Sequence, residues 1–94
     1  VYKRQVREMV QQAGYGDYFA HGTGHGTGLE IHEAPSISAR SDQTLAAGMV
    51  FTIEPGCYFP HQWGIRLEEM VHLTGQGGQV MTTLDKRLDA AIIE

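Results

Sequence analysis

Three segments of this chain place histidine or glutamate beside glycine or proline, and together they form a candidate metal site. The segments are HGTGHGTGLEIHEAP (21–35), TIEPGCYFP (52–60) and GIRLEE (64–69). Imidazole and carboxylate groups are ligands that hard and borderline divalent cations prefer, and two such cations close together can activate water for attack on a carbonyl group. The pattern therefore indicates metal-dependent hydrolytic chemistry.

His25 is the strongest candidate ligand in the first segment, because glycine on both sides leaves room for a cation and a substrate. Glycine occupies every second position from 22 to 28 and costs a helix about 1 kcal/mol each relative to alanine, so we expect an extended segment. His21 and His25 then share one face, where His21 could orient the substrate or His25. His32 has the opposite parity and needs a bend near Gly28 to reach the same cavity. The alternative is a flexible glycine loop with incidental histidines.

The other two segments each contribute a glutamate. Glu54 follows an apolar run and precedes Pro55, which favours extended geometry, so its carboxylate should leave a buried strand edge and need a partner. Glu68 lies two residues after Arg66 on the same side of an extended segment, where the arginine could pair with a carboxylate or a substrate anion. The alternatives are an exposed strand-end glutamate at 54 and a surface salt bridge at 66 and 68. The three segments together favour the metal site.

Periodicity predicts the elements that position these residues. Apolar residues at helical spacing over 2–13, followed by Gly14 as a C-terminal cap, predict an amphipathic helix. Alternation predicts strands at the remaining positions, and polar or glycine-rich stretches predict the connections. The predicted strands are 21–31, ended by Pro35, then 49–54, 65–73 and 79–82, with a surface loop over 35–47, turns at Pro55–Gly56 and 76–78, and helical spacing in the tail over 84–94. The fold class is α+β, with a curved, mainly antiparallel sheet and covering helices.

Size and composition restrict the function classes. Ninety-four residues form at most one small domain, which buries about 60–65% of its unfolded surface. A net charge of -4 with scattered basic residues argues against nucleic-acid binding. The sequence contains neither an apolar run of about 18–20 residues nor a signal-peptide pattern, so we expect no membrane association. The single cysteine, Cys57, excludes an internal disulfide and favours the cytoplasm. Because residue 1 is valine and helix-like sequence begins at once, we expect a fragment.

Three motifs, HGTGHGTGLEIHE, GMVFTIEPG and GIRLEEMV, resemble the C-terminal half of the pita-bread metallopeptidases. That family includes methionine aminopeptidase, aminopeptidase P and Xaa-Pro dipeptidase (prolidase). The resemblance covers nearly the whole chain, so residues 1–94 are expected to be the C-terminal part of a metallopeptidase catalytic domain, one of two pseudo-symmetric halves. It implies two divalent metal ions, manganese first, with cobalt, zinc or iron as alternatives. The metal ligands by motif are His25, Glu54 and Glu68.

The same resemblance implies the catalytic roles. A water or hydroxide bridging the metal pair attacks the peptide carbonyl, Glu54 also acts as general acid/base, and His32 stabilises the developing oxyanion. His21, His32 and Arg66 are the implied substrate-binding residues. The initial HGTGHG and the RLE around Glu68 are similar to the proline-specific branch, so we expect a peptide substrate cleaved at a Xaa-Pro bond.

The chain departs from the family at two further ligands. The family uses two aspartates about a dozen residues apart in the preceding half, and the aspartates here, at 17, 42, 85 and 89, do not fit that pattern. We therefore expect the isolated chain to have little or no peptidase activity. Methionine aminopeptidase and a non-catalytic peptide- or protein-binding pita-bread module are the alternative functions. A homodimer is consistent with the resemblance, although no residue demonstrates it.

Overall fold

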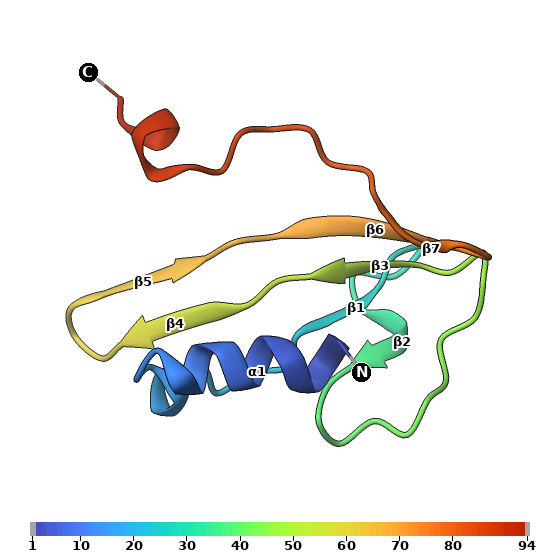
Figure 1. Cartoon of the computed structure of the whole chain (residues 1–94), viewed down its shortest axis with the longest axis horizontal. Helices are drawn as coiled ribbons and strands as arrows, with labels where there is room; N and C mark the ends of the chain where they lie inside the picture. The colour runs from blue at the N-terminus through green and yellow to red at the C-terminus, as the bar shows by residue number, and fades with distance from the viewer. Residues whose placement is uncertain (1, 94) are drawn as a thin grey trace.

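The computed structural model describes residues 2–93 as one helix beside antiparallel sheets (Figure 1), which confirms the predicted α+β class. A five-stranded sheet has the order β2-β1-β3-β6-β7, and β4 pairs with β5 in a two-stranded sheet. All the strand pairs are antiparallel. The elements are α1 (Tyr2–Gln12), η1 (Gly16–Tyr18), β1 (Gly24–Gly26), β2 (Glu33–Ile37), β3 (Val50–Ile53), β4 (Gly56–Phe59), β5 (Trp63–Arg66), β6 (Glu69–Thr74), β7 (Gly77–Val80) and η2 (Leu88–Ala91).

Helix α1 ends as its sequence predicts. Gly14 has a φ of 88°, the left-handed conformation that glycine adopts after a helix. Its N–H donates to the carbonyl of Gln11 at 3.0 Å, and the N–H of Tyr15 donates to Val10 at 3.0 Å. The short helix η1 follows and contacts both α1 and β4, so α1 lies alongside the two-stranded sheet (Figure 1).

The strand predicted through Leu29 and Ile31 is wrong. Strand β1 ends at Gly26, and residues 28–32 form a bend in which Leu29 is 104% exposed and Ile31 is 83% exposed. The Glu33 carboxylate accepts a hydrogen bond from the Glu30 N–H at 3.1 Å, which closes the bend. The chain then returns as β2, paired with β1.

The prediction that Pro35 ends this strand region is wrong. Pro35 lies inside β2 and is buried. The physical reason is that β2 is an edge strand, where a residue without an N–H breaks no essential ladder bond. On the open edge, the side-chain Oε1 of Gln43 accepts a hydrogen bond from the Ser36 N–H at 2.7 Å. The loop predicted over 35–47 therefore begins after Ile37.

The turn predicted at Pro55–Gly56 is also wrong. The chain continues from β3 into β4 in nearly the same direction (Figure 1) and reverses at residues 60–62, where the Gln62 N–H donates to Phe59 at 3.0 Å. The predicted strand 65–73 is divided into β5 and β6, because β5 pairs with β4 and β6 pairs with β3. Pro55 lacks an N–H to continue the ladder, although its carbonyl accepts a hydrogen bond from the Leu67 N–H at 3.1 Å.

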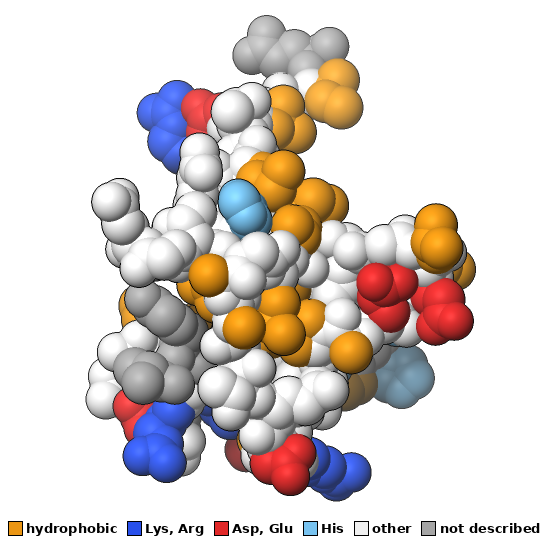
Figure 2. Space-filling view, turned by 90° about the vertical axis from the view of Figure 1, so that its right-hand side faces the viewer, with side chains coloured by type: hydrophobic (Ala, Val, Ile, Leu, Met, Phe, Trp, Pro, Cys, Tyr) orange, Lys and Arg blue, Asp and Glu red, His pale blue; other side chains and the backbone are white. Residues whose placement is uncertain are grey.

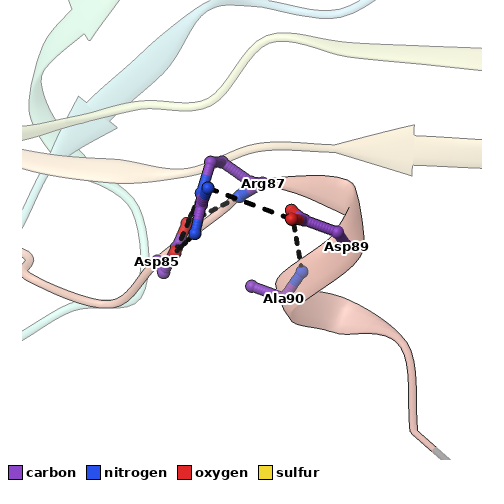
Figure 3. Close-up of polar contacts among 4 residues, drawn as sticks. All are labelled: Asp85, Arg87, Asp89 and Ala90. Atoms are coloured by element: carbon purple, nitrogen blue, oxygen red, sulfur yellow. Dashed lines mark hydrogen bonds and ion pairs between the residues drawn. The ribbon is translucent and has the colours of Figure 1, made fainter.

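The C-terminal region differs from the prediction in both its turn and its tail. The β6–β7 hairpin turns at Gly75 and Gln76, slightly before the predicted 76–78. The tail contains the short helix η2 in place of a helix over 84–94. Arg87 there pairs with Asp85 at 2.8 Å and Asp89 at 3.9 Å, and Asp89 accepts a hydrogen bond from the Ala90 N–H (Figure 3). These contacts are exposed and local to the tail.

The core is small and lies where the helix connection meets the sheet. Its buried hydrophobic residues among those described are Phe19, Ile37 and Phe51, at 1%, 1% and 5% exposure. Figure 2 shows hydrophobic side chains gathered at the surface of one face. Within residues 2–93, no helix is long and apolar enough to cross a membrane.

Candidate active site

His25 on β1 and Glu54, which follows β3, form the centre of the candidate site. His25 Nε2 lies 3.6 Å from Glu54 Oε1, and the side chains are 19% and 13% exposed. The backbone at both positions is fixed by neighbouring strand residues. The His25 N–H donates to Thr52 Oγ1 at 3.0 Å, and the Glu54 N–H donates to the Thr23 carbonyl at 2.6 Å.

The protonation of His25 follows from its second contact. Nδ1 lies 2.9 Å from the Gly26 carbonyl, which can only accept, so Nδ1 carries the proton. In the neutral ring, Nε2 then presents a lone pair toward the Glu54 carboxylate. Two facing acceptors repel one another unless a proton or a cation lies between them. An imidazole nitrogen and a carboxylate oxygen held in this way fit a divalent metal ion.

His32 joins His25 through the bend that the sequence requires near Gly28. The two imidazole rings meet edge to face, with centroids 4.5 Å apart and an interplanar angle of 78°. Both rings line an open cavity of about 470 Å³. The other residues lining this cavity are Glu30, Glu33, Ala34, Ser36 and Gln43. No pattern in the sequence indicates Gln43, because only the path of the loop brings it to the edge of β2.

Glu68 lies exposed between β5 and β6. The β3–β6 register pairs Ile53 with Glu69, and extending it by one position places Glu68 opposite Glu54. The β4–β5 register pairs Gly56 with Arg66, so the two ladders continue the same alignment on both sides of this interruption. Directly opposed residues of an antiparallel pair have Cβ atoms about 4.5–5.5 Å apart. The backbones of Glu54 and Glu68 therefore lie opposite one another in the short gap between the two ladders.

The metal set itself is not assembled by the described side chains. Among residues 2–93, no group of three or more histidine, cysteine, aspartate or glutamate side chains is arranged to hold a metal ion. The structure brings His25 to Glu54, and the register brings the backbone of Glu68 to the same region. The metal-binding role of all three residues stays a prediction.

His21 and Arg66 each contact the ring of Tyr58, away from the His25–Glu54 pair. The His21 ring meets the Tyr58 ring edge to face at 5.7 Å, and the Arg66 guanidinium carbon lies 5.5 Å from the same ring centroid. A Cβ on Gly56 would stand 3.0 Å from His21 Nε2, so glycine leaves space for the imidazole. The sequence prediction missed Tyr58. Its position two residues after Gly56 on an extended strand places its side chain on the same face as Gly56.

The chain belongs to metallopeptidase family M24, because the family profile matches residues 2–75. It is 49% identical over 83 residues to the Xaa-Pro dipeptidase of Pyrococcus furiosus, covering 88% of this chain and 24% of that protein. The solved Xaa-Pro dipeptidase from Bacillus anthracis matches with a TM-score of 0.83 and 49% identity over 87% of this chain and 23% of that one. The X-prolyl aminopeptidase of Caenorhabditis elegans, described as a cytosolic enzyme with a di-nuclear active site, matches with a TM-score of 0.72 and 31% identity, over 89% and 16%.

The chain spans about a quarter of the length of the curated relatives that it matches. Its likeness to solved prolidases confirms the expected fold, the C-terminal part of a pita-bread domain. The family defined by the profile is one of metallopeptidases.

Proposed function

We propose that this chain supplies His25, Glu54 and Glu68 to the divalent metal site of a peptidase that cleaves Xaa-Pro bonds at the N-terminal end of peptides. The observation that carries the proposal is the 3.6 Å approach of His25 Nε2 to Glu54 Oε1, with Glu68 in register opposite Glu54. Two ions, most favourably Mn²⁺, with Co²⁺, Zn²⁺ or Fe²⁺ as alternatives, complete the site. The names of the relatives support the Xaa-Pro substrate, and the cytoplasm is the proposed location.

Each of the proposed site residues has a distinct role in this mechanism. When bound, the cations supply Lewis-acid polarisation and activation of water. His25 is held ready as a ligand because its Nδ1 proton is donated to Gly26, which leaves Nε2 free. Glu54 accepts and returns a proton beside that nitrogen, and His32, which lines a cavity with His25, donates to the carbonyl oxygen as negative charge develops there.

His21 and Arg66 bind the substrate away from the reacting carbonyl in this proposal. Both residues contact the ring of Tyr58, the His21 imidazole edge to face and the Arg66 guanidinium over the ring. The guanidinium suits a carboxylate, which it can hold through two parallel hydrogen bonds. A dipeptide ending in proline carries such a carboxylate one residue from the scissile bond.

A chimeric enzyme tests the proposal directly. The matching segment of the Pyrococcus furiosus Xaa-Pro dipeptidase is replaced by this chain, and hydrolysis of a Xaa-Pro dipeptide is measured with Mn²⁺ and after chelation. We expect metal-dependent turnover that Glu68→Gln abolishes and the surface control Glu8→Gln preserves. Cleavage of a Met-Gly peptide in preference to Xaa-Pro would favour methionine aminopeptidase. A folded chimera that cleaves neither peptide would support the non-catalytic alternative.

A further inference from the structure

Arg7, in the middle of α1, binds the segment that leads into the candidate site. Nη1 donates to the Phe19 carbonyl at 2.8 Å and Nη2 donates to the His21 carbonyl at 2.9 Å. The guanidinium carbon also lies 4.4 Å from the centroid of the Phe19 ring, which is 1% exposed. Residues 19–21 lie between η1 and β1 outside regular structure, so their carbonyls need donors from elsewhere. One side chain therefore fixes two carbonyls that no strand partner fixes.

The His21 ring depends on the backbone that Arg7 holds. Its Nδ1 lies 2.6 Å from the Gly22 carbonyl, which only accepts, so Nδ1 carries the proton. The His21 carbonyl lies in the peptide plane between His21 and Gly22, so holding it restricts the position of Gly22, whose oxygen meets the ring. Beyond Gly22, the Thr23 N–H donates to the Ile37 carbonyl at 2.7 Å and fixes the other end. Arg7 and the sheet thus hold this short segment from both sides.

The other nitrogen of His21 is unused. Nε2 is buried and has no hydrogen-bond partner among the described residues, and it lies next to Gly56. The ring is held between Phe19, at a centroid distance of 4.9 Å, and Tyr58. Buried polar atoms without a partner are uncommon in proteins and call for an explanation. A hydrogen-bond donor brought to Gly56 and Tyr58 would satisfy this one.

We propose that Arg7 is a positioning residue, whose guanidinium orients the His21 imidazole so that Nε2 stays an acceptor beside Gly56 and Tyr58, where the proposed function places the substrate. The substrate part of this statement rests on the proposed function, and the orientation of the ring does not. Arginine suits the task because its planar fork reaches two carbonyls at once while it stacks on an aromatic ring. Lysine, with one compact ammonium group, cannot reproduce both contacts.

The orientation is tested by NMR of the chain labelled with ¹⁵N-histidine. The wild-type His21, assigned with His21→Asn, should show one protonated and one unprotonated ring nitrogen. Arg7→Lys should lose this distinction, as the two tautomers exchange, while Arg4→Lys, exposed on the same helix, should keep it. An unchanged His21 pattern in Arg7→Lys, or an equal loss in Arg4→Lys, overturns the proposal. If Arg7→Lys does not fold, Arg7→Gln is measured, and failure of both to fold beside a folded Arg4→Lys reduces Arg7 to a purely structural residue.

A second readout separates this inference from the proposed function. In the chimeric enzyme, Arg7→Lys should raise KM for the Xaa-Pro dipeptide roughly tenfold and leave kcat within about twofold, because substrate binding is lost and the reacting groups are not. The effect should vanish in a His21→Asn background, since Arg7 acts through His21. A change in kcat alone contradicts the positioning role. If the chimera has no turnover, the proposed function fails, and the NMR result still decides the role of Arg7.

Discussion

Thr52 holds the candidate ligand His25 from the neighbouring strand. Its hydroxyl accepts a hydrogen bond from the His25 N–H at 3.0 Å and lies 3.4 Å from the His25 carbonyl, and the residue is 1% exposed. The hydroxyl therefore pairs the backbone of His25 where the ladder between β1 and β3 leaves it without a strand partner.

Thr52→Val should lower the free energy of unfolding by about 1–3 kcal/mol, because it leaves the part-buried His25 N–H unpaired. Denaturant unfolding measures the change. Thr74→Val is the matched control, since Thr74 donates to the Gly77 carbonyl in an exposed hairpin and should cost well under half as much. Equal losses in the two variants would contradict the role given to Thr52.

Residue type and spacing select part of this site from the sequence alone. They select His25 for its flanking glycines and Glu54 for its place after an apolar strand, but they do not predict the bend that brings His32 to His25. They do not find Gln43 or Tyr58, because only the loop path and the strand register place those side chains. The three proposed metal ligands are a separate case. The family resemblance and the strand register support them, whereas the described side chains do not form a metal-binding group.

At the scale of elements, alternating glycines bring strands together more closely than a side chain would permit. A Cβ on Gly24 would collide with the carbonyl of Thr52, and one on Gly26 would collide with the carbonyl of Ala34. The two glycines therefore let the backbones of β3 and β2 approach β1 closely. Strands β2 and β3 therefore pack closely against β1 on the two sides of the strand that carries His25.

Gly26→Ala should destabilise the chain by on the order of 3 kcal/mol or more, since the collision is with backbone that cannot move aside cheaply. Gly75→Ala is the control, because a Cβ there meets nothing within 4 Å. Thermal unfolding followed by circular dichroism should show a large fall for the first variant and almost none for the second. A similar melting temperature for both would refute the close approach of the strands.

Strand boundaries show where local pattern fails. The alternation from Ile65 to Leu73 reads as one strand, yet the ladder breaks at Leu67 and Glu68. The break comes from the opposite strand, where Pro55 cannot donate, and a pattern within one segment does not contain that information. The same break creates the gap in which Glu54 and Glu68 lie opposite one another.

The tail provides a pH prediction. Hydrogen bonds from Arg87 hold the pKa of the Asp85 carboxyl below its ordinary value of 3.8 (Figure 3). Because the folded pKa is depressed, the contribution of this contact is present above the ordinary value and is lost as the pH falls through the folded value. NMR signals of residues 85–90 should therefore change below about pH 4, while Asp85→Asn removes that transition. The pair is exposed, so the midpoint of global unfolding should not follow it.

At the scale of the whole molecule, three buried hydrophobic side chains support the described fold. A 94-residue domain has about 5–14 kcal/mol of stability in total. Phe51→Ala should remove about 3–5 kcal/mol of it, by the loss of burial and the cavity left behind. Leu29→Ala, at a side chain that is 104% exposed, should change the free energy of unfolding by less than about 0.5 kcal/mol. Denaturant titration of both variants checks the difference, and a tolerated Phe51→Ala would place the core elsewhere.

The length of the chain also bears on its chemistry. It spans about a quarter of its relatives, and its own aspartates do not match the spacing expected for the remaining ligands. Three ligands can hold one cation weakly, whereas a bridged pair needs more donors. We therefore expect the isolated chain to bind a metal ion without peptidase turnover at the rate of a complete enzyme.

Calorimetric titration of the chain with Mn²⁺ tests the central claim that His25, Glu54 and Glu68 share a cation. We predict weak binding of one ion per chain, weakened more than about tenfold by Glu54→Gln and by Glu68→Gln, and unchanged in the exposed control Glu8→Gln. Binding that all three variants retain equally, or a folded wild-type chain that binds no Mn²⁺, would contradict the account.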